Sequence, residues 1–252
     1  MFGIELKNQW ELEKIRQAAK IVSQVMLELK KEIKPGISTE KLDRLAYDLI
    51  QSYSAQPAFL GYQDYPATIC VSLNNEVVHG IPSPKKIIKE GDIVSLDLGV
   101  RYQGFYGDIA ATLGIGEIKN NAKKLIRVAR EALNRAISKI KVDKHIGDIC
   151  WAIQSHVEGN NFSVVRNYSG HGIGRELHEE PQIPCFGRPG SGVRLLAGMV
   201  LAVETMVNAG DWRIKVLPDR WTVVTSDGSL SAHFEHMVLV TNGQPEILTK
   251  HE

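Results

Sequence analysis

Several features that would identify common classes of protein are absent from the sequence. Only three cysteines occur among 252 residues, and none shares a CxxC spacing with another, which argues against a zinc knuckle and against a disulfide framework. No apolar run approaches the length of a transmembrane helix, and glutamates interrupt the N-terminal region before the apolar core of a signal peptide could form. We therefore expect a reduced, cytoplasmic setting and no membrane partner.

An excess of charge and the commonest catalytic motifs are absent as well. The 30 basic and 29 acidic residues leave a net charge of +1, so we expect no nucleic acid as a partner. No Walker loop, GxSxG or HExxH occurs. No low-complexity linker divides the chain, whose 43% hydrophobic content suits a sizeable core. We therefore predict one domain over residues 1–252.

Helical periodicity appears in two pairs of segments, and runs typical of strands follow each pair. The expected helices cover residues 15–29, 38–49, 121–140 and 146–157, and the expected strands cover 68–73, 92–100, 106–113, 198–207, 220–226 and 233–240. This doubled order predicts the α+β class with a largely antiparallel sheet. It also indicates two similar halves, residues 1–118 and 119–252.

Residues 94–112, VSLDLGVRYQGFYGDIAAT, are typical of a hairpin whose two strands each carry one aspartate. If the turn lies between Tyr102 and Gln103, Asp97 and Asp108 face each other directly. A turn one residue later makes them diagonal neighbours on the same face. Like charges facing across a strand pair are destabilising, and burying them unpaired costs more. A cation, either a basic side chain or a metal ion, should therefore lie between them.

Three more ionisable residues lie in unusual contexts. Glu204 and Glu235 interrupt the apolar runs GMVLAVETMV and HFEHMVLV, and His171 lies among glycines in NYSGHGIGRELHEEP. Those glycines would let the backbone of a loop approach a site closely or take positive φ. Taken singly, each residue is more often ordinary, as an exposed or arginine-paired glutamate or a loop histidine. The arginines that could neutralise these acids are Arg101, Arg175 and Arg213.

Taken together, these residues indicate a metal centre. Four carboxylates in apolar strands exceed what chance pairing with arginine accounts for, and two divalent ions would neutralise them. Oxygen ligands with one imidazole suit manganese, iron(II), cobalt or zinc, and not a closed structural zinc site. Two such ions side by side could activate a water molecule as a nucleophile.

Other histidines and aromatic residues could complete such a site. His79, in NNEVVHGIPSP, and His178 are placed for proton transfer or hydrogen bonding. Without a metal set, His79 would cap a turn and His178 would pair with a neighbouring surface glutamate. Aromatic residues that could line an apolar pocket, or simply be core, are Phe59, Tyr62, Tyr65 and Trp221. Histidines interpreted as structural or surface residues are His145, His156, His236 and His251.

The motifs that carry these residues resemble those of type I methionine aminopeptidases over nearly the whole chain. They are LDLGVRYQGFYGD, SGHGIGRELHEEP, GMVLAVETMVNAG, WTVVTSDGSLSAHFEH and NNEVVHGIP. The resemblance implies the pita-bread fold, with pseudo-twofold halves and helices outside a curved sheet. It also implies a monomeric dinuclear metallohydrolase that removes initiator methionine from nascent chains, at the ribosome, with preference for a small second residue.

The resemblance assigns roles to individual residues. The family's metal ligands fall on Asp97, Asp108, His171, Glu204 and Glu235. Asp108 and Glu235 would bridge two divalent ions, Asp97 would hold the ion nearer the substrate amine, and His171 and Glu204 would hold the other. Glu204 would also take a proton from water. His178 would donate to the substrate carbonyl oxygen, and His79 would hydrogen-bond near the scissile nitrogen.

The resemblance also implies a pocket for the methionine side chain, formed by Tyr62, Tyr65, Cys70, His79 and Trp221. Bordering positions depart from the commonest family pattern: Phe59 replaces a frequent cysteine, Leu177 a frequent phenylalanine and His233 a frequent glutamine. Thr205 replaces a usual proline and could loosen the backbone beside Glu204. Asn74 and Ser231 match positions that hold a monovalent cation in some members.

Two alternatives stay open at this point. Another pita-bread hydrolase, such as a prolidase or aminopeptidase P, would prefer Xaa-Pro substrates, although such enzymes typically carry a large N-terminal domain. A non-catalytic relative that contacts ribosomes or RNA would usually lose metal ligands, whereas all five positions are present here.

Overall fold

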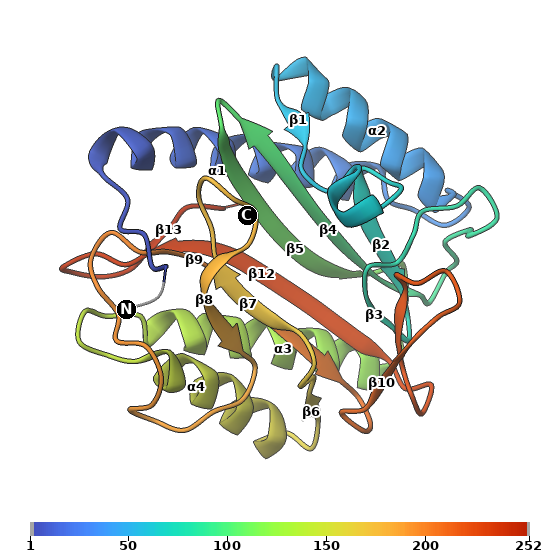
Figure 1. Cartoon of the computed structure of the whole chain (residues 1–252). Coiled ribbons are helices and arrows are strands. Elements are labelled where there is room, and N and C mark those ends of the chain that lie inside the picture. Colours follow the sequence, from blue (N-terminus) through green and yellow to red (C-terminus); the bar gives the residue numbers. More distant parts are fainter. Residues whose placement is uncertain (1–2, 251–252) are drawn as a thin grey trace.

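The fold repeats the predicted order of two helices followed by strands (Figure 1). The computed structural model describes residues 3–250. Its helices are α1 (Gln9–Glu32), α2 (Thr39–Ser52), α3 (Asn120–Ser138) and α4 (Ile146–Gly159), with a 3-10 turn, η1 (Tyr62–Asp64). Its strands are β1 (Gln56–Pro57), β2 (Ile69–Leu73), β3 (Glu76–Val78), β4 (Ile93–Tyr102), β5 (Phe105–Gly114), β6 (Ser163–Val164), β7 (Ser169–Gly172), β8 (Glu179–Pro184), β9 (Val200–Asn208), β10 (Ile214–Val216), β11 (Val223–Thr225), β12 (Ser231–Leu239) and β13 (Glu246–Ile247).

Capping residues determine where the first two helices begin. Asn8 and Glu11 form a capping box at the start of α1, in which each side chain accepts a hydrogen bond from the other's backbone N–H. This box places the start of α1 well before the apolar stripe that begins at Ile15. Ser38 caps α2 through a hydrogen bond from Lys41 N, as the sequence predicts.

The main sheet has ten strands and is antiparallel at every pairing. Its central order is β1-β4-β5-β12-β9-β7-β8, so strands from both predicted halves meet where β5 pairs with β12. A smaller sheet, β10-β11-β3, lies beside it. The predicted largely antiparallel sheet is therefore confirmed. The division into two similar halves stays a prediction.

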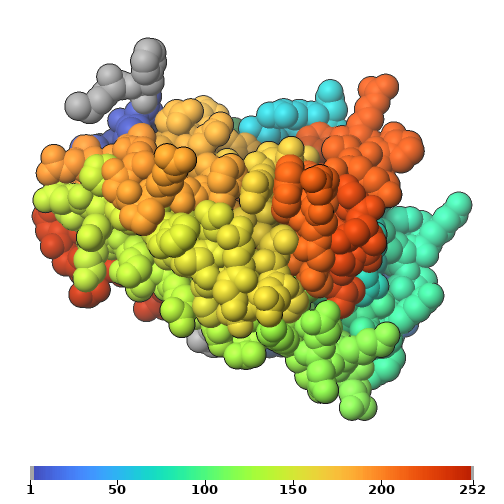
Figure 2. All heavy atoms as spheres, turned by 90° about the horizontal axis from the view of Figure 1, so that it is seen from below, coloured from blue at the N-terminus to red at the C-terminus, as the bar shows by residue number. Residues whose placement is uncertain are grey.

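Helices cover one face of the main sheet. α1 packs against β4 and β5, and α3 packs against β9 and β12 (Figure 1). Figure 2 shows the side on which α3 and α4 lie, covered by the side chains of lime and yellow segments. Residues on the helix-facing side of the strands, such as Leu96, Ile109 and Val203, are fully buried in the main core. None of the helices described is both long and apolar enough to cross a bilayer.

The glycine-rich segment around His171 is a strand and not the loop that the sequence predicts. His171 lies in β7, which pairs with both β8 and β9. A Cβ atom on Gly170 would lie 2.5 Å from the carbonyl oxygen of Ala202, and one on Gly172 would lie 2.2 Å from that of Glu180. The glycines therefore permit close strand packing, and neither of these two has positive φ. A four-residue strand is too short to show the alternation that identifies strands.

Truncating a core side chain on the helix-facing side should destabilise the protein without changing the opposite face. We expect Leu96→Ala to lower the free energy of unfolding by about 2–5 kcal/mol, because Leu96 is fully buried and its loss leaves a cavity. Urea unfolding followed by circular dichroism measures the change. Leu60→Ala is the control, since Leu60 is 47% exposed. An equal loss in both variants would contradict the packing described.

Candidate metal centre and pocket

The hairpin of β4 and β5 brings Asp97 and Asp108 together as diagonal neighbours. Tyr102 pairs with Phe105, so the turn is centred on Gln103 and Gly104, both of which have positive φ. Asp97 lies opposite Ala110, and Asp108 lies opposite Gly99. The second of the two predicted turn positions is therefore correct.

Five neighbouring strands each contribute one ionisable residue to the same face of the sheet. The strand order β4-β5-β12-β9-β7 carries, in that order, Asp97, Asp108, Glu235, Glu204 and His171. Glu235 lies directly opposite Glu204 and also pairs with Ala110, while His171 lies opposite Ala202. The period of two along each strand turns these side chains away from the helices. The sheet register alone therefore assembles the whole set.

These carboxylates are buried, and no lysine or arginine among the described residues forms an ion pair with them. All five residues are at most 9% exposed, and Asp108 Oδ1 and Glu235 Oε1 have no hydrogen-bond partner among the residues described. Arg175 pairs with Glu11, Arg213 pairs with Asp211, and Arg101 lies over the Tyr106 ring. The alternative that these three arginines neutralise the buried carboxylates is therefore wrong.

Burial and mutual repulsion make it hard for the carboxyl groups to ionise together. Burial raises the pKa of Asp108 and Glu235 well above their ordinary values, and neighbouring carboxylates raise both further. Burial also raises the pKa of Asp97 to about 7. At Glu204, burial would raise the pKa, but a hydrogen bond from His233 and its charge outweigh this and lower it. A bound cation would relieve the shared penalty.

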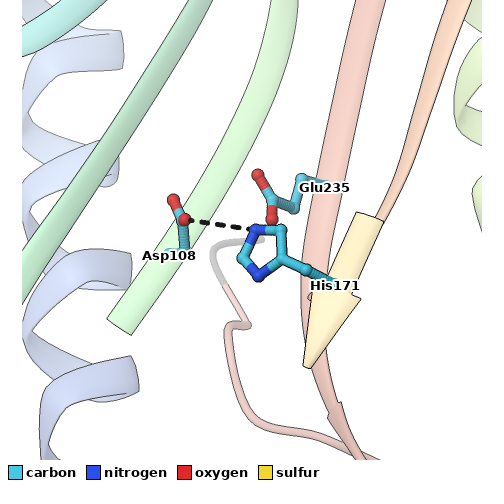
Figure 3. Close-up of side chains that lie close together, drawn as sticks. All are labelled: Asp108, His171 and Glu235. Carbon is cyan, nitrogen blue, oxygen red and sulfur yellow. Dashed lines mark ion pairs between the residues drawn. The ribbon is translucent and has the colours of Figure 1, made fainter. Parts of the chain in front are cut away.

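The donor atoms fit divalent metal ions. Ligand atoms of Asp108, His171 and Glu235 lie within 4.8 Å of one another, and so do those of Glu204, His233 and Glu235. Figure 3 shows the first three side chains pointing toward one another, with His171 Nε2 4.0 Å from Asp108 Oδ2. His171 Nδ1 donates to the Gly172 carbonyl oxygen at 2.9 Å, which leaves Nε2 free to bind a metal. Asp97 lines the same cavity outside these two close groups.

A cavity of about 560 Å³ opens beside this set. Every pocket residue predicted from the sequence lines it: Phe59, Tyr62, Tyr65, Cys70, His79, Leu177, His178, Trp221 and His233. Lining residues that the sequence did not reveal include Tyr168, Met206 and Gln182. Tyr168 and Met206 lie within the motifs that carry His171 and Glu204, and Gln182 directly follows the first of these motifs, but none of the three is an acid, a histidine or a glycine that would single it out.

His79 and His178 both line the cavity and are held by aromatic neighbours. The His79 ring packs edge-on against Tyr168 and Trp221, at centroid distances of 5.3 and 5.8 Å. His178 Nδ1 lies 2.7 Å from the Tyr62 hydroxyl, which excludes the predicted surface pairing as its main contact. Burial lowers the pKa of each imidazole to about 4. Both rings are therefore neutral near pH 7, and a Tyr62 hydroxyl that donates to Nδ1 leaves His178 Nε2 protonated.

A buried lysine holds the segment that carries His178. Glu179 Oε2 accepts a hydrogen bond from Lys7 Nζ at 2.7 Å, and the lysine side chain is only 1% exposed. Glu179 Oε1 accepts from the backbone N–H groups of Arg175 and Glu176. The N-terminal segment thereby fixes the turn before His178. The 172 positions that separate the two partners leave no local signal of this contact in the sequence.

Three further predicted positions have defined contacts. Asn74 and Ser231 are brought together, since Ser231 N donates to the Asn74 carbonyl oxygen at 2.8 Å. Thr205 does not loosen β9 as expected, because it is fully buried and its hydroxyl donates to the Ala129 carbonyl oxygen on α3 at 3.0 Å.

Removing the central aspartate should abolish metal loading. We expect Asp108→Ala to lose most bound manganese or cobalt, because Asp108 supplies an unpartnered buried oxygen to the cluster. Isothermal titration calorimetry and elemental analysis of the purified protein measure the loss. Asp48→Ala, at an exposed position of α2, is the matched control. Wild-type metal content in Asp108→Ala would show that the metal centre lies elsewhere.

Comparisons with known proteins agree with the site and the fold. Residues 13–242 match metallopeptidase family M24. The chain is 50% identical to a methionine aminopeptidase of Clostridium perfringens, over 98% of each chain. It superposes on the crystal structure of a methionine aminopeptidase from Thermotoga maritima with a TM-score of 0.97 and 49% identity, covering 98% of this chain and 99% of that one. A prolidase from Pyrococcus furiosus shares the fold, with a TM-score of 0.81 and 23% identity over 98% of this chain and 66% of its own. The resemblance to type I methionine aminopeptidases and the α+β pita-bread class are thereby confirmed, and the chain belongs to metallopeptidase family M24.

Proposed function

We propose that this metallopeptidase removes the N-terminal methionine from nascent polypeptides by hydrolysing the first peptide bond, with preference for a small second residue. One observation carries the proposal: four buried carboxylates and one histidine from five neighbouring strands line the same cavity of about 560 Å³. Half of the chain's residues are identical to those of a methionine aminopeptidase over almost the full length of both proteins.

The five residues would hold two divalent ions, with Asp108 and Glu235 shared between them. The unpartnered oxygens of these two carboxylates support the shared role. Asp97 would complete one position, and His171 and Glu204 the other. When bound, the ions would lower the pKa of a water molecule and polarise the substrate carbonyl. The oxygen-rich donor set suits cobalt, manganese, iron or zinc.

Side chains of the chain itself would handle protons and hydrogen bonds. Glu204 would accept a proton, because its lowered pKa keeps the carboxylate ionised at neutral pH. His178 Nε2–H would donate to the carbonyl oxygen as negative charge develops there, with Tyr62 fixing the ring. His79 would hydrogen-bond near the scissile nitrogen from its place against Trp221.

The methionine side chain would enter the apolar part of the cavity. Tyr65 and Cys70 are buried there, and Tyr65 packs edge-on against Trp221 with a centroid distance of 5.0 Å. Phe59 borders the same space and narrows it relative to a cysteine at that position. Asn74 and Ser231 would form a separate site for a monovalent cation, which their backbone hydrogen bond supports.

The proposal also covers the setting in which the enzyme acts. It would work in the cytoplasm, as a monomer with one catalytic domain, on chains emerging from the ribosome. The exposed position of His178 at the cavity mouth supports access by the end of a flexible polypeptide.

A release assay tests the reaction and its specificity together. Metal-stripped protein should release methionine from Met-Ala-Ser only after cobalt or manganese is added, and should release little from Met-Leu-Ser. Amino-acid analysis of the supernatant measures the product. Preferential hydrolysis of Xaa-Pro peptides would assign the chain to a prolidase-like activity instead. Absence of hydrolysis with every metal would favour a non-catalytic role.

Replacing His178 should affect turnover and not metal binding. We expect His178→Ala to lower kcat by about 10²–10³-fold, because it removes a hydrogen-bond donor to the developing oxyanion. Metal content should match that of the wild type, since His178 belongs to neither close group of donor atoms. Steady-state kinetics on Met-Ala-Ser and elemental analysis separate the two effects. Loss of metal in this variant would assign His178 to the metal ligands.

A further inference from the structure

His233 occupies a position that the proposed reaction does not use. It lies on β12 two residues before Glu235, and its residue pair across the sheet is Met206 on β9. Glu204 is therefore a diagonal neighbour of His233 on the cavity face, within reach of a long side chain. His233 and Glu204 meet directly, with His233 Nε2 2.7 Å from Glu204 Oε2.

The direction of this hydrogen bond follows from the chemistry of the two groups. An ionised carboxylate can only accept hydrogen bonds, so Nε2 of His233 carries the proton and donates it. The other ring nitrogen, Nδ1, is buried and has no hydrogen-bond partner among the residues described. The imidazole thus makes one polar side-chain contact, which is with Glu204.

The surroundings hold the ring in place for this contact. The side chain of His233 is only 3% exposed and that of Glu204 11%. The backbone of His233 is fixed from β5, because its N–H donates to the Thr112 hydroxyl and its carbonyl oxygen accepts from the same hydroxyl, both at 2.8 Å. A donor with both its backbone and its ring immobilised can set the orientation of the carboxylate that it contacts.

We infer that His233 is a positioning residue, whose Nε2–H holds Glu204 Oε2 so that the other carboxylate oxygen of Glu204 is the one presented to the metal ions. This inference rests on the proposed function of Glu204. Without the donor, Glu204 would face Glu235 across the strand pair with nothing to fix its rotamer. A glutamine side chain carries an N–H donor at a similar reach.

Three substitutions of His233 distinguish the effect of losing the hydrogen-bond donor from the effects of losing the imidazole ring and the side-chain volume. His233→Gln keeps a donor, His233→Leu keeps bulk without a donor, and His233→Asn keeps a polar amide that is too short to reach Glu204. His156→Leu on α4 is the matched control, since His156 contacts Glu131 far from the cavity. Each full-length protein is stripped of metal, and its unfolding temperature is measured first to establish that it is folded.

Manganese affinity by calorimetry and steady-state kinetics on Met-Ala-Ser then give independent readouts. We expect His233→Leu and His233→Asn to weaken manganese binding about 10- to 100-fold, as loss of a hydrogen bond to a metal ligand typically does. kcat should fall with little change in KM, because Glu204 acts on the reacting groups and not on the methionine side chain. His233→Gln and His156→Leu should stay within a few-fold of wild type.

Two results would overturn the inference. One is wild-type affinity and kcat in both His233→Leu and His233→Asn. The other is a His233→Gln variant as impaired as His233→Leu, which would mean that the imidazole itself binds metal, as its membership of a close donor group permits. An inactive wild-type protein would instead refute the proposed function, while the manganese affinities of the variants would still test the role of His233.

Discussion

Repulsion between buried carboxylates is the constraint around which this structure is organised. Four acids lie on adjacent strands of one sheet, and bringing each ionised group out of water costs several kcal/mol without compensation. The opposite face of the same strands supplies that compensation, because its leucines, isoleucines and valines are packed under α1 and α3. β9 illustrates the result, since all nine of its residues are buried although only one face contacts the helices.

Side chains along a strand alternate between the two faces of the sheet, which explains how one sheet carries the buried acids on one face and the apolar core on the other. Along β5, Ile109 and Ala111 belong to the core under the helices, whereas Asp108 lies on the opposite face and lines the cavity. A slip of one residue in any central strand would exchange the two sets and place a charge in the core. The five ionisable residues of the proposed site are therefore held by the sheet register, and the segment that carries His178 is held by separate contacts such as that of Lys7 with Glu179.

The four acids can be located from the sequence because a charged residue is unexpected within an apolar run that is typical of a buried strand. Asp97, Asp108, Glu204 and Glu235 each interrupt an apolar strand, and this local conflict is visible without any structure. The strand containing His171 was missed, since four residues are too few to show a period. The contacts of Tyr62 with His178 and of His233 with Glu204 join residues 116 and 29 positions apart, so no local pattern could reveal them. The sequence already favoured a metal ion over arginine as the neutralising partner of the acids, and the structure adds that Arg101, Arg175 and Arg213 have other contacts.

The central place of β12 in the sheet makes the site depend on a strand from the C-terminal part of the chain. This strand lies near the C-terminal end of the sequence and, in the sheet, between β5 and β9. It supplies Glu235 and separates Asp108 from Glu204 by one strand width. Among the described strands, β5 and β9 are joined in the main sheet through β12. The set of five ionisable residues is therefore complete only in a fold where a strand near the C-terminal end of the sequence lies between two strands that precede it.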